Sequence, residues 1–142
     1  MKVFIDTNIF IRFFTHDLEE KVPECERLIE LIQDGKVKPC ISNIVILELI
    51  FVLTRQYKFK KESVLKALKK LLSLRNIMVV EVTKTEGALQ LFMKHNIKYT
   101  DCLIATQIPK GVTLVTYDSD FSKIPALKPI TPAEIFNSDT VN

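Results

Sequence analysis

The sequence predicts an α/β domain built around a parallel β-sheet, and two observations lead to this fold class. Short, continuous apolar runs such as Val3-Phe4-Ile5 are typical of strands that are buried on both faces. Longer stretches in which apolar residues recur every three or four positions are typical of amphipathic helices. The two kinds of segment alternate along the chain, which predicts parallel strands joined by right-handed helical crossovers.

Four strands are expected, at residues 3–5, 37–41, 77–82 and 112–116. Helices are expected at residues 9–14, 22–33, 43–56, 60–74, 84–94 and 100–107. Pro23 suits the first turn of the second helix, and Gly35 is expected to end it. Ser42 is expected to cap the third helix. The tail, which holds Pro129 and Pro132, could add a short edge strand at residues 129–131 and one helical turn.

The length and composition predict one domain, residues 1–142, because 142 residues of which 47% are hydrophobic can bury a single core. Met1 leads directly into the first strand, so no signal peptide is expected. The longest apolar stretch, residues 44–53, is half of the roughly twenty residues that cross a membrane. No membrane association is therefore expected. The three separated cysteines have no metal-finger spacing and predict free, core-packed thiols in a reduced, cytoplasmic compartment: Cys25, Cys40 and Cys102.

Charge is distributed unevenly, although the net charge is only +3. Residues 17–34 carry seven acids against two bases, and residues 55–75 carry eight bases against one acid. A basic face of this kind could follow the backbone of a polyanion, or both segments could simply be solvated helix faces. The candidates for an RNA-binding surface are the lysines off the apolar stripe of the fourth helix: Lys61, Lys66, Lys69 and Lys70.

Four acids stand out because of their positions. Asp6 ends the first strand and Asp118 follows the fourth. Both acids therefore lie at the carboxyl ends of strands, which is where open parallel sheets bind ligands. Glu48 lies among nine apolar residues, so its helix is expected to be buried on most sides and its carboxylate to need a partner. That partner could be Arg55 in an ion pair. Asp101 begins an apolar helix, and there it could merely favour the helix dipole. Asp6 could likewise be a turn or cap residue.

Taken together, these four carboxylates would repel one another unless a cation bridged them. Oxygen ligands alone select a hard ion, which indicates Mg²⁺ or Mn²⁺ rather than Zn²⁺. A carboxylate-bound Mg²⁺ suits phosphate chemistry, because it can activate a water molecule and neutralise charge on a phosphodiester. The two histidines, His16 and His95, are expected at the surface.

The order and spacing of these motifs resemble the PIN domain, the nuclease module of VapC-type toxins. Four stretches carry the resemblance: residues 3–8, 42–53 with Glu48, 100–105 with Asp101, and 114–121 with Asp118. The resemblance implies a three-layer α/β/α sandwich with a four- to five-stranded parallel sheet. It also implies an endoribonuclease that depends on Mg²⁺ or Mn²⁺.

By position, the resemblance gives metal-site roles to Asp6, Glu48, Asp101 and Asp118. Asp120 is either an accessory acid of the site or a cap of the turn before Phe121. Asn8 and Thr116 are candidates for hydrogen bonds that orient the acids.

The leading hypothesis is a toxin-type endoribonuclease that acts on RNA, pairs into a homodimer and has a separate small antitoxin protein. Phe10, Phe13 and Phe14 could serve either protein interface or could be ordinary core. Two alternatives remain open: a housekeeping RNA-processing nuclease with the same site, and an RNA-binding scaffold that has lost catalysis. A phosphoacceptor domain is disfavoured because it gives Glu48 no role.

Overall fold

The computed structural model describes residues 1–137, and its centre is a four-stranded sheet in the order β3-β2-β1-β4. The strands are β1 (Lys2–Ile5), β2 (Lys38–Ser42), β3 (Met78–Val80) and β4 (Thr113–Val115), and all three pairings are parallel. The prediction of a parallel sheet is therefore confirmed. Because β1 lies between β2 and β4, its Val3, Phe4 and Ile5 are inaccessible to solvent.

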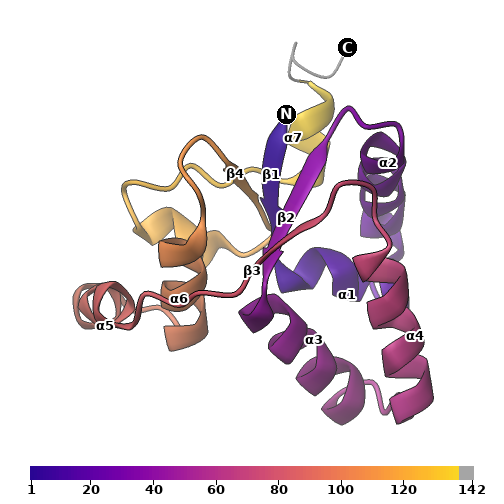
Figure 1. Cartoon of the computed structure of the whole chain (residues 1–142), viewed down its shortest axis with the longest axis horizontal. Helices are drawn as coiled ribbons and strands as arrows, with labels where there is room; N and C mark the ends of the chain where they lie inside the picture. The colour runs from indigo at the N-terminus through magenta and orange to yellow at the C-terminus, as the bar shows by residue number, and fades with distance from the viewer. Residues whose placement is uncertain (138–142) are drawn as a thin grey trace.

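Helices cover both faces of this sheet, as the predicted α/β/α sandwich requires. In Figure 1, α2 and α4 lie on one side of the strands and α5 and α6 on the other. Helices α1 and α3 begin directly after β1 and β2, at the carboxyl ends of these strands. The helices are α1 (Thr7–Thr15), α2 (Val22–Gln33), α3 (Asn43–Arg55), α4 (Lys61–Leu72), α5 (Thr85–Lys94), α6 (Tyr99–Gln107) and α7 (Pro132–Phe136).

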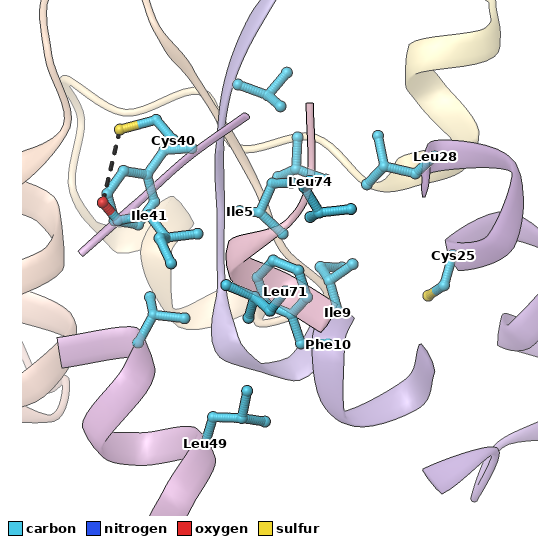
Figure 2. Packing of buried hydrophobic residues seen from close by; sticks show 14 of the residues in the cluster. Ile5, Ile9, Phe10, Cys25, Leu28, Cys40, Ile41, Leu49, Leu71 and Leu74 are labelled. Carbon is cyan, nitrogen blue, oxygen red and sulfur yellow. Dashed lines mark hydrogen bonds between the residues drawn. The ribbon is translucent and has the colours of Figure 1, made fainter. Parts of the chain in front are cut away.

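The larger core cluster packs mainly between the sheet and the helices α1 to α4, and Figure 2 shows part of it from close by. A smaller cluster lies at α5 and α6. Phe10, on α1, is 1% exposed, so it is a core residue and not part of a protein interface. Phe13 and Phe14 are only partly buried, and their rings meet edge to face with centroids 5.3 Å apart. All three cysteines are free and buried, as expected. Figure 2 labels the core side chains Ile5, Ile9, Phe10, Cys25, Leu28, Cys40, Ile41, Leu49, Leu71 and Leu74.

Helix α3 differs from its prediction, because it is not buried on most sides. Only the stripe at Val45, Leu49 and Leu53 is buried, at the four-residue spacing of one helix face. Leu47 and Phe51 are each 59% exposed. The apolar run in the sequence therefore combines a core stripe with an apolar surface.

Ser42 is the N-cap residue of α3, as predicted, whereas the edge strand considered at residues 129–131 does not form. The side chain of Ser42 makes no capping hydrogen bond, and its buried Oγ has no partner in residues 1–137. Residues 129–131 form a single bridge, Ile130 with Val115, rather than a strand. The reason is that Thr131 already caps α7 in a reciprocal pair with Glu134. Within residues 1–137, no helix is long and apolar enough to cross a membrane.

Candidate metal-dependent nuclease site

The carboxyl ends of β1 and β4 bring two of the predicted acids together. Asp6 follows β1 and Asp118 lies just beyond β4, and these strands are neighbours in the sheet. Asp6 is 5% exposed, and its Oδ1 accepts a hydrogen bond of 2.8 Å from the backbone N–H of Thr7. The same carboxylate therefore caps α1 and faces the strand ends.

A saturated hydrogen-bond network fixes the second oxygen of Asp6. The hydroxyl of Thr116 donates to Asp6 Oδ2 over 2.7 Å, and it accepts the backbone N–H of Asp118 over 2.9 Å. The amide nitrogen of Asn8 donates both to Asp6 Oδ2 and to Thr116 Oγ1, over 3.0 and 3.1 Å. Asn8 Oδ1 accepts the N–H of Tyr117. Thr116 and Asn8 therefore hold the two strand-end acids in one fixed arrangement.

Helices α3 and α6 bring the other two acids to the same place. All four carboxylates line one small hollow of about 140 Å³, which we call the acid hollow. Oε1 of Glu48 and Oδ2 of Asp101 are buried there and have no hydrogen-bond partner in residues 1–137. The ion pair considered between Glu48 and Arg55 does not form. The two ion pairs of the described chain are Arg12 with Asp17 and Lys123 with Asp120. The lining residues are Asp6, Thr7, Asn8, Ile11, Glu48, Val52, Lys98, Asp101 and Asp118.

Burial makes it costly to ionise these acids. It is the largest cause that raises the pKa of Glu48, from 4.5 to about 7, and repulsion from Asp6 and Asp101 adds to it. Burial, followed by repulsion from Asp6 and Asp118, raises the pKa of Asp101 from 3.8 to about 7. Burial also raises the pKa of Asp6, against the opposing hydrogen bond from Thr116. The positive charge of Lys98 partly opposes the rise at all three acids.

These properties fit a hard divalent cation, although no three His, Cys, Asp or Glu side chains of residues 1–137 form a ready-made ligand group. These two buried carboxylate oxygens have no hydrogen-bond partner in the described part of the chain, and a bound cation would coordinate them. The acidic side chains that could ligate a metal here are all carboxylates, and oxygen ligands of this kind suit Mg²⁺ or Mn²⁺. A bound cation would also offset the repulsion that raises the pKa values of Glu48 and Asp101.

Asp120 and the four lysines lie outside the acid hollow. The backbone N–H of Asp120 bonds to Asp118 Oδ1, and its carboxylate pairs with Lys123 at 2.7 Å. The lysines are exposed on α4, and none of them lines the acid hollow. One of them, Lys70, lies 4.8 Å from the ring centre of Phe13. The role of Asp120 in metal binding stays a prediction. The same is true of RNA binding by the four lysines, which are Lys61, Lys66, Lys69 and Lys70.

Sequence reasoning missed two features of this region. Lys98 lines the acid hollow from a position three residues before Asp101, and a lysine that precedes an acid at a helix start was the available signal. Tyr117, next to Asp118, donates its hydroxyl to Glu24 on α2 over 2.8 Å. No sequence signal connects Tyr117 with Glu24, because 93 positions separate them.

The sequence and the fold are similar to those of known proteins. The PIN domain model matches residues 3–127. A VapC ribonuclease from Aquifex aeolicus is 26% identical over 132 residues, which are 92% of this chain and 96% of the relative. The structure of VapBC2 from Rickettsia felis bound to a DNA fragment from their promoter gives a TM-score of 0.65 at 26% identity, over 92% of this chain and 98% of that one.

A third comparison extends the likeness of the fold. The Mycobacterium tuberculosis toxin VapC20, described as cleaving the sarcin–ricin loop, gives a TM-score of 0.71 at 21% identity. The superposition covers 92% of this chain and 99% of that one. The family model thus spans all four acids and, apart from Lys2, all four strands. On these grounds, the chain belongs to the PIN domain family.

Proposed function

We propose that this protein is a Mg²⁺- or Mn²⁺-dependent endoribonuclease and the toxin of a VapBC-type toxin–antitoxin pair. The observation that carries the proposal is the acid hollow, in which four carboxylates meet at the strand ends and two buried oxygens have no partner. The similarity to a VapC ribonuclease along almost the whole chain supports the same activity.

In this proposal, Asp6, Glu48, Asp101 and Asp118 would hold the cation, which would supply an activated water and neutralise charge on the phosphodiester. Thr116 and Asn8 fix the carboxylate of Asp6, so that one ligand is oriented before the cation arrives. Burial and repulsion raise the pKa values of Glu48 and Asp101 to about 7, so binding of a cation would displace protons from these two carboxyls near neutral pH.

We also propose that the protein works in the cytoplasm as a homodimer and binds a small antitoxin. Support for the antitoxin comes from the similarity to chains in toxin–antitoxin complexes from Rickettsia felis and Klebsiella pneumoniae. Support for protein contacts in general comes from apolar side chains that are exposed on α3 and α5. These are Leu47, Ile50, Phe51, Leu89, Phe92 and Met93.

The test is an RNA cleavage assay with purified protein in EDTA, Mg²⁺ and Mn²⁺. We expect cleavage only with a cation, and loss of cleavage in Glu48→Gln, which keeps the shape of the side chain but not its charge. Glu26→Gln is the matched control, because Glu26 is exposed on α2 and lies outside the acid hollow. Cleavage by Glu48→Gln at the wild-type rate would refute the proposed site, and binding without cleavage would favour an inactive scaffold.

Expression in cells separates the toxin from a housekeeping nuclease. A toxin should arrest growth when it is produced alone, and co-production of the protein encoded by the neighbouring gene should relieve the arrest. Glu48→Gln should be harmless in the same cells. Full growth with an active enzyme would contradict the toxin role while leaving the nuclease activity standing.

A further inference from the structure

Lys98 is a single positive charge placed against the acid hollow. It is exposed, and among residues 1–137 no other lysine or arginine lines that hollow. Lys98 takes part in neither of the two ion pairs of the described chain. Its ammonium group is therefore open to a ligand that comes from solvent.

Lys98 also lines a second, larger hollow beside the first. This neighbouring hollow measures about 420 Å³, which lies within the range of roughly 300–1,000 Å³ that ligand sites occupy. The two hollows share Glu48, Val52 and Lys98, so they are adjacent. Lys98 is again the one cation of the lining, which consists of Leu47, Glu48, Phe51, Val52, Gln56, Lys98 and Thr100.

The position of Lys98 in its helix does not explain why a lysine is there. Lys98 is the N-cap residue of α6, but its side chain makes no capping hydrogen bond. Ser, Thr, Asp and Asn are the side chains that stabilise this position, and a positive charge at a helix N-terminus opposes the helix dipole. The charge of Lys98 acts on the acid hollow instead. It partly opposes the rise that burial causes in the pKa of three acids, which are Asp6, Glu48 and Asp101.

We propose that Lys98 binds a phosphate of the RNA strand where the acid hollow adjoins the neighbouring hollow. This inference rests on the proposed nuclease function. A row of four carboxylates repels a phosphodiester backbone, and the bound cation offsets only part of that charge. Lys98 supplies positive charge at the point where the strand passes from the open hollow to the acids. Its three donors bind phosphate as a point charge, without demanding one geometry.

Loss of the Lys98 charge should change the affinity for RNA and the affinity for metal in opposite directions. The positive charge of Lys98 attracts the negatively charged RNA phosphate but repels the divalent cation, which is also positive. Removing the ammonium group should therefore weaken RNA binding and tighten metal binding. A residue that only supported the shape of the site would weaken both together.

The experiment compares Lys98→Met, Lys98→Arg and Lys94→Met with the wild type. Lys94→Met is the matched control, because Lys94 is exposed at the end of α5 and lines neither hollow. Binding of a short, fluorescein-labelled single-stranded RNA is measured by anisotropy in EDTA, across a salt series. Binding of Mn²⁺ is measured by calorimetry without RNA.

For Lys98→Met we expect RNA binding to weaken roughly two- to tenfold and Mn²⁺ binding to tighten by a similar factor. The slope of log affinity against log salt should fall by about 0.7, which corresponds to one lost phosphate contact. Lys98→Arg should behave as the wild type in both assays. Equal effects of Lys98→Met and Lys94→Met, or a joint loss of metal and RNA affinity, would overturn the proposal.

Failure of this inference is distinguishable from failure of the proposed function. If the wild type cuts RNA with Mn²⁺ and Lys98→Met binds RNA as tightly as the wild type, only the role of Lys98 is wrong. If RNA binding depends on Lys98 but the wild type never cuts, the phosphate contact stands and the nuclease function is wrong.

Discussion

Replacing Glu48 by glutamine should stabilise the metal-free protein at alkaline pH and leave its stability unchanged at acidic pH. Burial and repulsion raise the pKa of this carboxyl from 4.5 to about 7 in the folded protein. Between these two values the folded state holds the proton more tightly than the unfolded chain does. The free energy of unfolding therefore falls as the pH rises from about 4.5 to about 7, and the full penalty remains above that range.

The size of the effect follows from the same shift. At about 1.4 kcal/mol per pKa unit, the rise at Glu48 corresponds to at most about 3–4 kcal/mol. Partial solvent screening and the shared repulsion with Asp101 reduce this to about 1–2 kcal/mol. For a chain of this length, such a gain raises the melting temperature by about 3–6 °C.

The assay is thermal unfolding in EDTA at pH 4.5 and pH 8, with Glu26→Gln as the control. Glu48→Gln should melt later than the wild type at pH 8 only, and Glu26→Gln should match the wild type at both pH values. Added Mn²⁺ should stabilise the wild type more than Glu48→Gln, because a ligand that binds the folded state raises its stability. Equal melting of Glu48→Gln and the wild type at pH 8 would show that this carboxylate bears no ionisation penalty.

Three further predictions concern the surroundings of the site. Thr116→Val should weaken Mn²⁺ binding by roughly ten- to a hundredfold in calorimetry, whereas Thr116→Ser should keep it, because the hydroxyl orients Asp6. Tyr117→Phe should lower the free energy of unfolding by about 1 kcal/mol in urea, since Glu24 loses a hydrogen bond; no change would mean that water replaces it. A variant in which four lysines on α4 become glutamine should bind RNA more weakly and with a flatter salt dependence. An unchanged slope of log affinity against log salt would exclude α4 as the RNA-binding surface. The four lysines are Lys61, Lys66, Lys69 and Lys70.

The fold was largely predictable because its elements are marked locally. Continuous apolar runs mark the buried strands, and Pro23 and Gly35 mark the two ends of α2. Errors arose where a tertiary contact decides the outcome. A sequence cannot show that Leu47 and Phe51 face outward on α3, because that depends on how the helix is rotated against the sheet. A pattern of nine apolar neighbours has too little periodicity to reveal this rotation.

The candidate site was predictable to the extent that topology decides it. Asp6 and Asp118 follow strands, and parallel strands place their carboxyl ends at one edge. The hydrogen bonds of Thr116 and Asn8 follow from the same geometry. Lys98 was not predicted, because its role depends on charges contributed by three other segments. Its place before an acid at a helix start is a local signal, but that signal does not show how near the other acids lie.

The pairing of β1 with β4 has a consequence for how the protein is made. Asp6 and Thr116, whose hydroxyl donates to it, are 110 positions apart. The first strand therefore cannot pair with β4 until 110 further residues have been added. A ribosome that adds about 5–20 residues per second needs roughly five to twenty seconds to cover that distance. Throughout that time the nascent chain lacks both Thr116 and Asp118, and the acid hollow cannot assemble. If the protein cuts RNA as proposed, the nascent chain cannot cleave the message that encodes it until Thr116 and Asp118 have been added.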